Sequence, residues 1–268
     1  MKESCLQFGP EARLSGILSE PDWGRSLGLV LISAGLTPKP GPFRLYTELA
    51  RRLTDEGVTT LRFDLGGIGD SNAGYPGQPL AARSELEIRA ALDEVAKEQT
   101  SGGLVLAGLC SGAEDAVRAA AGDPRVTSVV LIDPFAYRAP GFSWRHGLYR
   151  AKRRLLRALG VYQPLAKSVA PRAVSYEYMA RAESTRLLRA LLARDVHLHF
   201  VYTGGMREKL NHPAQLAAAF PDLDFRDHVT IDYFPHMDHT APLAADRREL
   251  IEVVARRLRD DSSATRWN

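Results

Sequence analysis

The stretch of sequence that decides the fold is GLVLAGLCSGAEDA, residues 103–116. Its apolar start over residues 103–107 predicts a buried strand, and a helix is expected over residues 111–121. Between them, the sequence GLCSG places one glycine two residues before Cys110 and another two residues after it. This spacing is typical of a sharp strand-to-helix turn that exposes its central side chain. Because a helix N-terminus favours a thiolate, Cys110 is the candidate nucleophile.

Ser111 is the other nucleophilic residue of this turn. Centring the motif on Ser111 would put Leu109 and Ala113 where glycines are needed, so Ser111 fits less well. Its backbone N–H is expected instead to form part of an oxyanion hole. The alternative is that Cys110 is a small buried apolar residue in a tight turn, which is common for free cysteines.

Strand and helix patterns alternate on both sides of this stretch. After an initial hairpin, this alternation predicts an α/β fold with a mostly parallel eight-stranded sheet and helices on both faces. The other strands are expected at residues 4–8, 13–19, 27–35, 58–63, 126–132, 196–202 and 229–234. The other helices are expected at residues 43–56, 81–99, 213–219 and 243–258.

The alternation is interrupted after the sixth strand. We expect residues 1–134 and 195–268 to form the core domain, and residues 135–194 to form a helical cap, because a structureless loop of that length is improbable. Residues 138–194 hold 13 Lys and Arg against two acidic residues, whereas the rest of the chain holds 22 against 30. The cap is therefore basic and the core acidic.

The basic cap suggests an anionic partner. Arg150, Arg153 and Arg154 are candidates to bind an acidic acyl carrier protein or the phosphates of coenzyme A. We expect the apolar residues of the same helix to face the pocket: Leu148, Leu155, Leu156 and Leu159. The alternative is that these charges belong to a solvated helix surface.

Two further motifs carry a resemblance to a known family. The stretch LRFDLGGIGDS matches a D-x-x-G-x-G-x-S pattern with Asp64, Gly67, Gly69 and Ser71, and here the chain resembles the α/β-hydrolase superfamily. In that family the segment is structural. The stretch FPHMDHTAP, residues 234–242, lies where the family places its catalytic histidine, and the match implies His239.

Alternatives remain at this histidine and at its acidic partner. His236 is the second choice for the base, and a metal site of His236, Asp238 and His239 lacks further ligands. Family acids usually follow the seventh strand, but the sequence there, VYTGGMREKLNH, has no aspartate. Asp133, after the sixth strand, is slightly preferred to Glu208 as the acid. By analogy, the second oxyanion donor is the backbone N–H of Gly35 or Leu36, with Leu36 preferred.

The resemblance implies acyl chemistry. A G-x-C-x-G turn occurs in dienelactone hydrolases and polyhydroxyalkanoate synthases, and the order of motifs is similar to that of bacterial exosortase-associated hydrolases and of serine-aminopeptidase-like lipases and thioesterases. It implies an acyl-ester or acyl-thioester hydrolase with a covalent acyl-Cys intermediate. An acyltransferase using the same cysteine and a non-catalytic hydrolase-like binding protein are the alternatives. The chemistry requires no cofactor and no metal.

Composition limits the remaining classes. A formal charge of +3 over 268 residues does not indicate nucleic-acid binding. The N-terminus has no apolar signal region, and the longest apolar run, residues 27–32, is too short to span a bilayer. We therefore expect a cytoplasmic protein in which Cys5 and Cys110 are both thiols.

Overall fold

The fold is built on a single mixed sheet. The computed structural model describes residues 1–24, 27–72, 78–98, 102–161, 178–225 and 227–265. Within these residues, eight strands pair in the order β1-β2-β4-β3-β5-β6-β7-β8. Their bounds are β1 (Lys2–Phe8), β2 (Leu14–Glu20), β3 (Leu27–Ile32), β4 (Val58–Phe63), β5 (Leu104–Leu109), β6 (Val126–Ile132), β7 (His197–Thr203) and β8 (Val229–Phe234).

The direction of the strands follows the predicted pattern. The β1–β2 and β2–β4 pairs are antiparallel, and each later pair is parallel. All six residues of β3 are buried, as expected for a parallel strand covered on both faces. The mostly parallel eight-stranded sheet with an initial hairpin is therefore confirmed.

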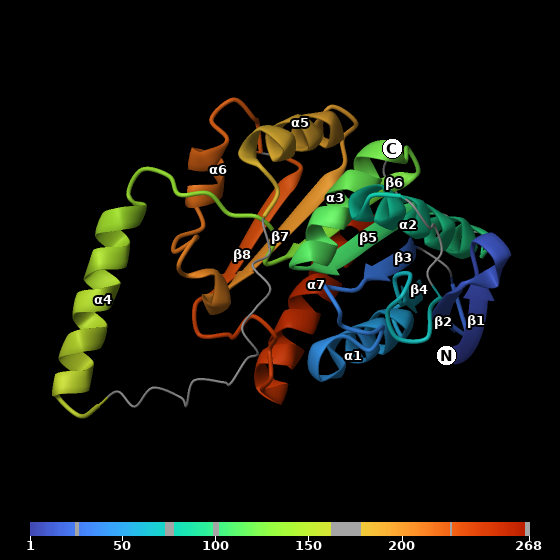
Figure 1. Ribbon diagram of the computed structural model, residues 1–268, viewed down its shortest axis with the longest axis horizontal. Helices are drawn as coiled ribbons and strands as arrows, with labels where there is room; N and C mark the ends of the chain where they lie inside the picture. Colours follow the sequence, from blue (N-terminus) through green and yellow to red (C-terminus); the bar gives the residue numbers. More distant parts are fainter. Residues whose placement is uncertain (25–26, 73–77, 99–101, 162–177, 226, 266–268) are drawn as a thin grey trace.

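Helices cover both faces of the sheet (Figure 1). Buried residues of α2 (Leu80–Ala96), α3 (Ser111–Gly122) and α5 (Arg181–Leu192) join one apolar cluster. Those of α1 (Leu45–Thr54) and α7 (Ala244–Thr265) join the other. Neighbouring strand residues alternate between the clusters: Val30 belongs to the first, whereas Leu29 and Leu31 belong to the second. The short helix α6 (Gln215–Ala219) adds Leu216 and Ala219 to the first cluster.

The segment between β6 and β7 holds two helices of different character. Helix α5 packs on α3 and buries Leu187, Leu188 and Leu191 in the core. Helix α4 (Phe142–Ala158) stands apart from the sheet and its covering helices (Figure 1), and Phe142 is its one fully buried residue. Residues 162–177 of the expected cap lie outside the described residues, and the division into core and cap stays a prediction.

The expected orientation of the apolar residues of α4 is wrong. Leu148, Leu155 and Leu159 face solvent rather than a pocket, and Leu156 is half-buried. An amphipathic pattern shows that a helix has an apolar face, but it does not show what covers that face. Here none of the described residues covers it.

The candidate functional residues lie where the parallel strands end. Loops that follow β3, β5, β6, β7 and β8 leave the same edge of the sheet because these five strands are parallel. Residues far apart in the sequence are thereby brought together, as is usual for ligand sites in sheets of this type.

Candidate active site

Cys110 occupies the turn between β5 and α3. Its backbone has φ 55° and ψ −119°, a conformation that is strained for any residue other than glycine. The turn is held by the Cys110 N–H, which donates to Ile132 O at 2.9 Å, and by the Cys110 carbonyl, which accepts from Ala113 N at 3.1 Å. The side chain remains partly exposed. A strained turn of this kind presents the sulfur in front of the first N–H groups of α3.

The two glycines of the motif leave room for this turn. A Cβ atom on Gly108 would lie 2.3 Å from the carbonyl carbon of Gly112. A Cβ atom on Gly112 would lie 2.5 Å from Ile32 O, in the neighbouring strand β3. Any side chain at either position would therefore push α3 away from the sheet, which explains the G-x-C-x-G pattern.

His239 lies in the loop between β8 and α7, with Asp133 as its partner. The Nδ1 atom of His239 lies 2.7 Å from Oδ2 of Asp133, and the ring lies close enough to Cys110 for the cysteine to raise its pKa. Burial alone would lower the pKa of His239. The hydrogen bond to Asp133 and the interaction with Cys110, together with the charges of both groups, outweigh burial and raise that pKa to about 10. The histidine therefore holds a proton at neutral pH.

Asp133 is fully buried, and its carboxylate has three hydrogen-bond partners. It follows β6 directly with a positive φ of 46°. Its carboxylate accepts the backbone N–H of Thr203 at 2.6 Å and the Thr203 hydroxyl at 2.5 Å, in addition to the His239 ring. These contacts give hydrogen-bond partners to a carboxylate that is buried away from water.

The alternative acid, Glu208, lies elsewhere. Its side chain is 78% exposed and pairs with His146 of α4 at 3.5 Å. His236, the second choice for the base, pairs with Glu249 at 2.9 Å. Of the candidates named from the sequence, the structure thus brings together Cys110, His239 and Asp133.

The turn after β7, Thr203-Gly204-Gly205, makes room for the histidine loop. A Cβ atom on Gly205 would lie 2.5 Å from the Cβ of His239, and one on Gly204 would lie 2.4 Å from Pro235 O. The sequence analysis considered this turn only as a possible position for the acid and did not predict that its glycines make room for the histidine loop. The signal that could have shown it is the pair of adjacent glycines that directly follows a strand.

The loop after β3 lies against the start of α3. The Gly35 N–H donates to the Ser111 hydroxyl oxygen at 2.8 Å, so this N–H is already used. No hydrogen bond among the described residues uses the Leu36 N–H, and the Leu36 side chain is 85% exposed. The Ser111 hydroxyl thus ties the two expected oxyanion donors, at Leu36 and Ser111, into one unit.

A buried ion pair holds the same loop from its other end. The Lys39 ammonium lies 2.7 Å from Oδ2 of Asp64, and the Lys39 N–H donates to Oδ1 at 2.5 Å. Ser71 donates to the backbone carbonyl of Asp64 at 2.6 Å, and a Cβ atom on Gly69 would lie 2.3 Å from the Asp64 carboxylate. The D-x-x-G-x-G-x-S segment therefore positions the loop that carries Leu36.

Comparisons with known proteins agree with this architecture. No protein-family model and no curated protein matches the chain. An α/β serine hydrolase homologue from Coxiella burnetii superposes with a TM-score of 0.60 at 17% identity, covering 96% of this chain and 97% of that one. The α/β hydrolase GrgF from Penicillium sp. sh18 gives 0.61 at 17% identity, covering 99% of both chains. The chain has the α/β-hydrolase fold.

A third solved structure extends the likeness. An esterase from Pyrococcus furiosus superposes with a TM-score of 0.61 at 15% identity, covering 97% of this chain and 91% of that one. Near-complete coverage of both chains means that the α/β-hydrolase fold accounts for nearly the whole protein.

Lys209 and Tyr178 lie close enough to Cys110 for its charge to affect their pKa values. The Lys209 ammonium lies 2.9 Å from the centroid of the Tyr178 ring. Burial lowers the pKa of Lys209, and the charges of Glu114 and Cys110 act against it. Burial, followed by the charge of Cys110, raises the pKa of Tyr178 to about 12. The sequence carried no motif that pointed to these residues.

The described residues give little support to the other classes of site. They contain no group of three or more His, Cys, Asp or Glu residues that could hold a metal ion. Nor does the part of the chain that the structure describes contain a helix long and apolar enough to cross a bilayer. The metal site considered for His236, Asp238 and His239 is thus not formed.

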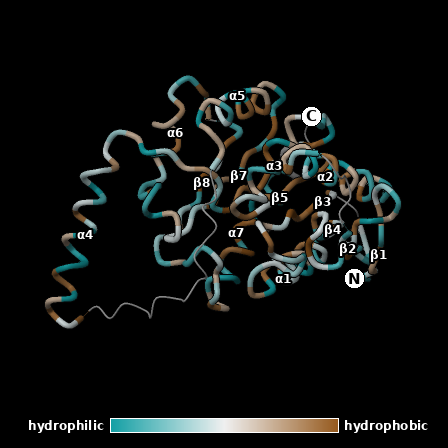
Figure 2. Tube along the Cα trace, in the orientation of Figure 1, coloured by the Kyte–Doolittle hydropathy of each residue, from teal (hydrophilic) through white to brown (hydrophobic). Residues whose placement is uncertain are grey.

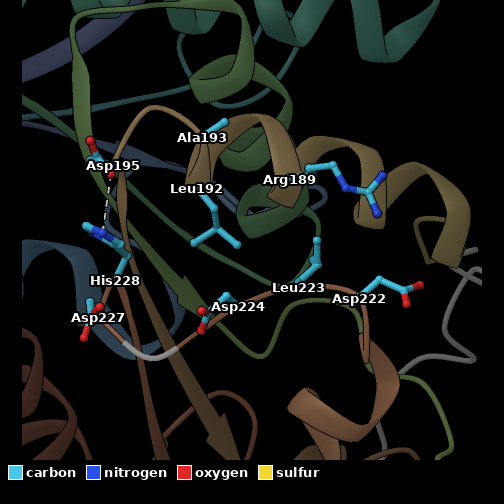
Figure 3. A pocket seen from close by; sticks show the side chains of 9 residues that line it. All are labelled: Arg189, Leu192, Ala193, Asp195, Asp222, Leu223, Asp224, Asp227 and His228. Atoms are coloured by element: carbon cyan, nitrogen blue, oxygen red, sulfur yellow. Dashed lines mark ion pairs between the residues drawn. The ribbon is translucent and has the colours of Figure 1, made fainter.

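A cavity of about 390 Å³ lies at the opposite edge of the sheet (Figure 3). Asp195, two residues before β7, and His228, directly before β8, line it and form an ion pair at 3.5 Å. Three further aspartates line it: Asp222, Asp224 and Asp227. Because Cys110 follows the carboxyl end of its strand, this acidic cavity is separate from the candidate active site.

Proposed function

We propose that this chain is an acyl-ester or acyl-thioester hydrolase that acts through a covalent acyl-Cys110 intermediate. The observation that carries the proposal is the line of contacts from Asp133 through His239 to Cys110. This is the geometry of a nucleophile, a base and an orienting acid. The esterase from Pyrococcus furiosus and the serine hydrolase homologue from Coxiella burnetii supply the analogy of fold.

The first half of the reaction forms the thioester. The sulfur of Cys110, reacting as the thiolate beside protonated His239, attacks the carbonyl carbon of the substrate to form a C–S bond. The carbonyl oxygen gains negative charge and accepts hydrogen bonds from the N–H groups of Ser111 and Leu36. The C–O or C–S bond of the substrate then breaks, and the alcohol or thiol leaves with the proton from His239.

The second half releases the acid. His239 is now neutral, and it takes a proton from a water molecule that attacks the thioester carbonyl. The bond to Cys110 breaks, the acid departs, and the protonated histidine and the thiolate are restored. Asp133 keeps Nδ1 of the ring occupied throughout, so that the other ring nitrogen serves both proton transfers.

The surroundings of Ser111 argue against a serine nucleophile. Its hydroxyl oxygen accepts the Gly35 N–H at 2.8 Å, whereas Cys110 is the nucleophilic side chain whose proximity raises the pKa of His239. The similar protein from Coxiella burnetii is described as a serine hydrolase homologue, and this chain carries a cysteine in the turn.

An acyltransferase would use the same covalent intermediate. A thioester reacts readily with amines and thiols as well as with water, so the choice between hydrolysis and transfer depends on the acceptor. The non-catalytic alternative relied on the missing aspartate after β7. It loses that support because Asp133 occupies the position beside His239.

The carrier of the acyl group stays a prediction. Arg150 and Arg154 are exposed on α4 and Arg153 is half-buried, so two of the three are open to an anionic carrier protein or to coenzyme A. The cytoplasmic location expected from the sequence also stays a prediction.

Intact-mass analysis after exposure to a panel of acyl thioesters and activated esters tests the proposal. Cys5 is exposed on β1 and would react without catalysis, so the experiment uses a Cys5→Ala background and compares it with Cys5→Ala/Cys110→Ala. A mass gain equal to the acyl group on the first protein alone is expected. Acylation of both proteins, or of neither with any member of the panel, would reject the acyl-Cys110 mechanism.

Product analysis then separates hydrolysis from transfer. Release of free acid at the same rate with and without added alcohols, thiols or amines supports the hydrolase. Preferential formation of a new ester, thioester or amide would support the acyltransferase instead.

A further inference from the structure

Helix α4 carries an apolar stripe on the side turned away from the body of the protein. Trp144, Leu148, Leu155 and Leu159 follow one another at separations of four, seven and four residues. Because an α-helix turns by about 100° per residue, these spacings place all four on one side. Each of the four is between 60% and 64% exposed. Figure 2 shows the resulting bands of hydrophilic and hydrophobic residues along α4.

The opposite side of α4 makes the contacts with the body. The Tyr149 hydroxyl accepts from the Arg207 guanidinium at 2.9 Å, and His146 pairs with Glu208 at 3.5 Å. The carbonyl of Phe142 accepts from the Asn211 side chain at 3.1 Å. Among the residues that the structure describes, these contacts fix which side of α4 points outward.

Exposed basic residues share α4 with the stripe: at about 100° per residue, Lys152 lies beside it, whereas Arg150 and Arg154 lie toward the opposite, polar side of the helix. Residues 134–176 contain no aspartate or glutamate. Arg150, Lys152 and Arg154 are exposed, and the structure gives none of them an acidic partner among the residues that it describes. The helix thus combines an exposed apolar side with cations on its polar side.

This combination is typical of a helix that lies in a membrane interface. Such helices have Trp and Leu on one side and Lys and Arg on the other, and they are too polar overall to cross the bilayer. A contiguous exposed apolar patch on a protein surface commonly marks an interaction site. The anionic head groups of a bilayer match the cations, and the acyl layer beneath matches the stripe over the whole length of the helix.

We propose that α4 binds the surface of an anionic membrane, lying parallel to it with Trp144, Leu148, Leu155 and Leu159 inserted among the lipids. An acidic carrier protein would use the cations, but it would need a complementary apolar groove as long as the helix. The lipid surface meets both requirements with no special shape, and for that reason it is the favoured partner. Binding of this kind does not depend on acyl chemistry at Cys110.

The contacts that hold α4 connect the apolar stripe to the candidate active site. Arg207 and Glu208 contact α4. They lie four and five residues after Thr203, which donates hydrogen bonds to Asp133. A membrane-bound α4 would therefore hold the loop beside His239 close to the lipid surface.

The test is flotation of the full chain with vesicles. Binding is expected with phosphatidylcholine vesicles that contain about one third phosphatidylglycerol, with loss in high salt and no binding to pure phosphatidylcholine. Arg150→Glu/Arg154→Glu is expected to weaken binding by at least about tenfold, since each basic residue contributes to attraction at the surface. Leu148→Ser/Leu155→Ser removes insertion and is expected to weaken binding similarly.

The matched control is Arg181→Glu/Arg186→Glu, which makes the same change in charge on helix α5. It should bind as the wild type does once the melting temperatures of all variants are shown to agree. Equal loss in the α4 and α5 variants would mean that net charge alone drives binding, and this would overturn the proposal. Failure to bind anionic vesicles at low salt would also overturn it, as would selective binding of an acidic acyl carrier protein without vesicle binding.

Two measurements keep this proposal separate from the catalytic one. Cys110→Ala should bind vesicles as the wild type does, so inactivity and loss of binding are distinguishable. In a Trp23→Phe/Trp267→Phe background, Trp144 is the one remaining tryptophan. Its emission should shift to the blue with anionic vesicles, and an unchanged spectrum under conditions of binding would exclude insertion of α4.

Discussion

His239 Nδ1 lies 2.7 Å from Oδ2 of Asp133, a carboxylate that follows β6, whereas the usual position of the acid is after β7. The relocation is possible because β6 and β7 are neighbouring parallel strands whose carboxyl ends lie side by side. Thr203, the last residue of β7, turns the carboxylate toward the histidine with two hydrogen bonds.

Asp133→Asn is expected to lower kcat/KM by about a hundredfold, because the amide no longer stabilises the protonated ring and favours the wrong tautomer. Glu208→Gln, at the exposed alternative position, should keep wild-type activity. Steady-state kinetics on the best ester or thioester substrate measures both. Inactivation by the Glu208 change with little effect of the Asp133 change would assign the acid differently.

The raised pKa of His239 gives a defined pH dependence of stability. The pKa is about 10 in the folded protein against an ordinary value of 6.5, so the folded state binds the proton more tightly. The stabilisation is fully present below about pH 6.5 and is lost as the pH rises through about 10. Urea unfolding from pH 6 to pH 10 should show this decline, and His239→Gln should flatten that part of the curve. A wild-type curve as flat as that of the variant would contradict the raised pKa.

Ser111→Ala is expected to reduce kcat by about tenfold while Cys110 is still acylated. The change removes the acceptor of the Gly35 N–H and loosens one oxyanion donor without deleting it. Rapid-quench measurement of the acylation rate checks the prediction. Complete loss of acylation in Ser111→Ala would instead favour the serine as nucleophile.

Gly205→Ala should lower activity by at least about tenfold, because the new Cβ atom would lie 2.5 Å from the Cβ of His239 and a small displacement of a catalytic group is costly. Gly147→Ala, in α4 with no atom within 4 Å of the new Cβ, is the control. Circular dichroism should show both variants folded. Unchanged kinetics in Gly205→Ala would mean that the histidine loop adjusts freely.

Asp64→Asn is expected to reduce the free energy of unfolding by about 3 kcal/mol, because it leaves the Lys39 ammonium without its buried partner. Asp70→Asn removes only the exposed partner of the same lysine and should have a clearly smaller effect. Urea unfolding at neutral pH compares the two. Equal effects would show that the buried position of Asp64 has no special weight.

Much of this fold was predictable because its elements depend on local patterns. Strands β4, β6 and β8 have the bounds that their apolar runs predicted, and the glycines around Cys110 predicted the turn. The acid beside His239 was harder to choose, since the choice depends on which strands are neighbours. The outward stripe of α4 was predicted to face inward, because periodicity alone does not reveal which side is covered.

Thr203, at the end of β7, donates two hydrogen bonds to the Asp133 carboxylate, and neither of them involves the His239 ring. The orientation of the carboxylate therefore does not depend on the ring. If His239 swings aside to admit a bulky acyl group, it can return to an acceptor that has kept its orientation. Turnover of large substrates would then require the His239 side chain to move while Thr203 and Asp133 keep their positions.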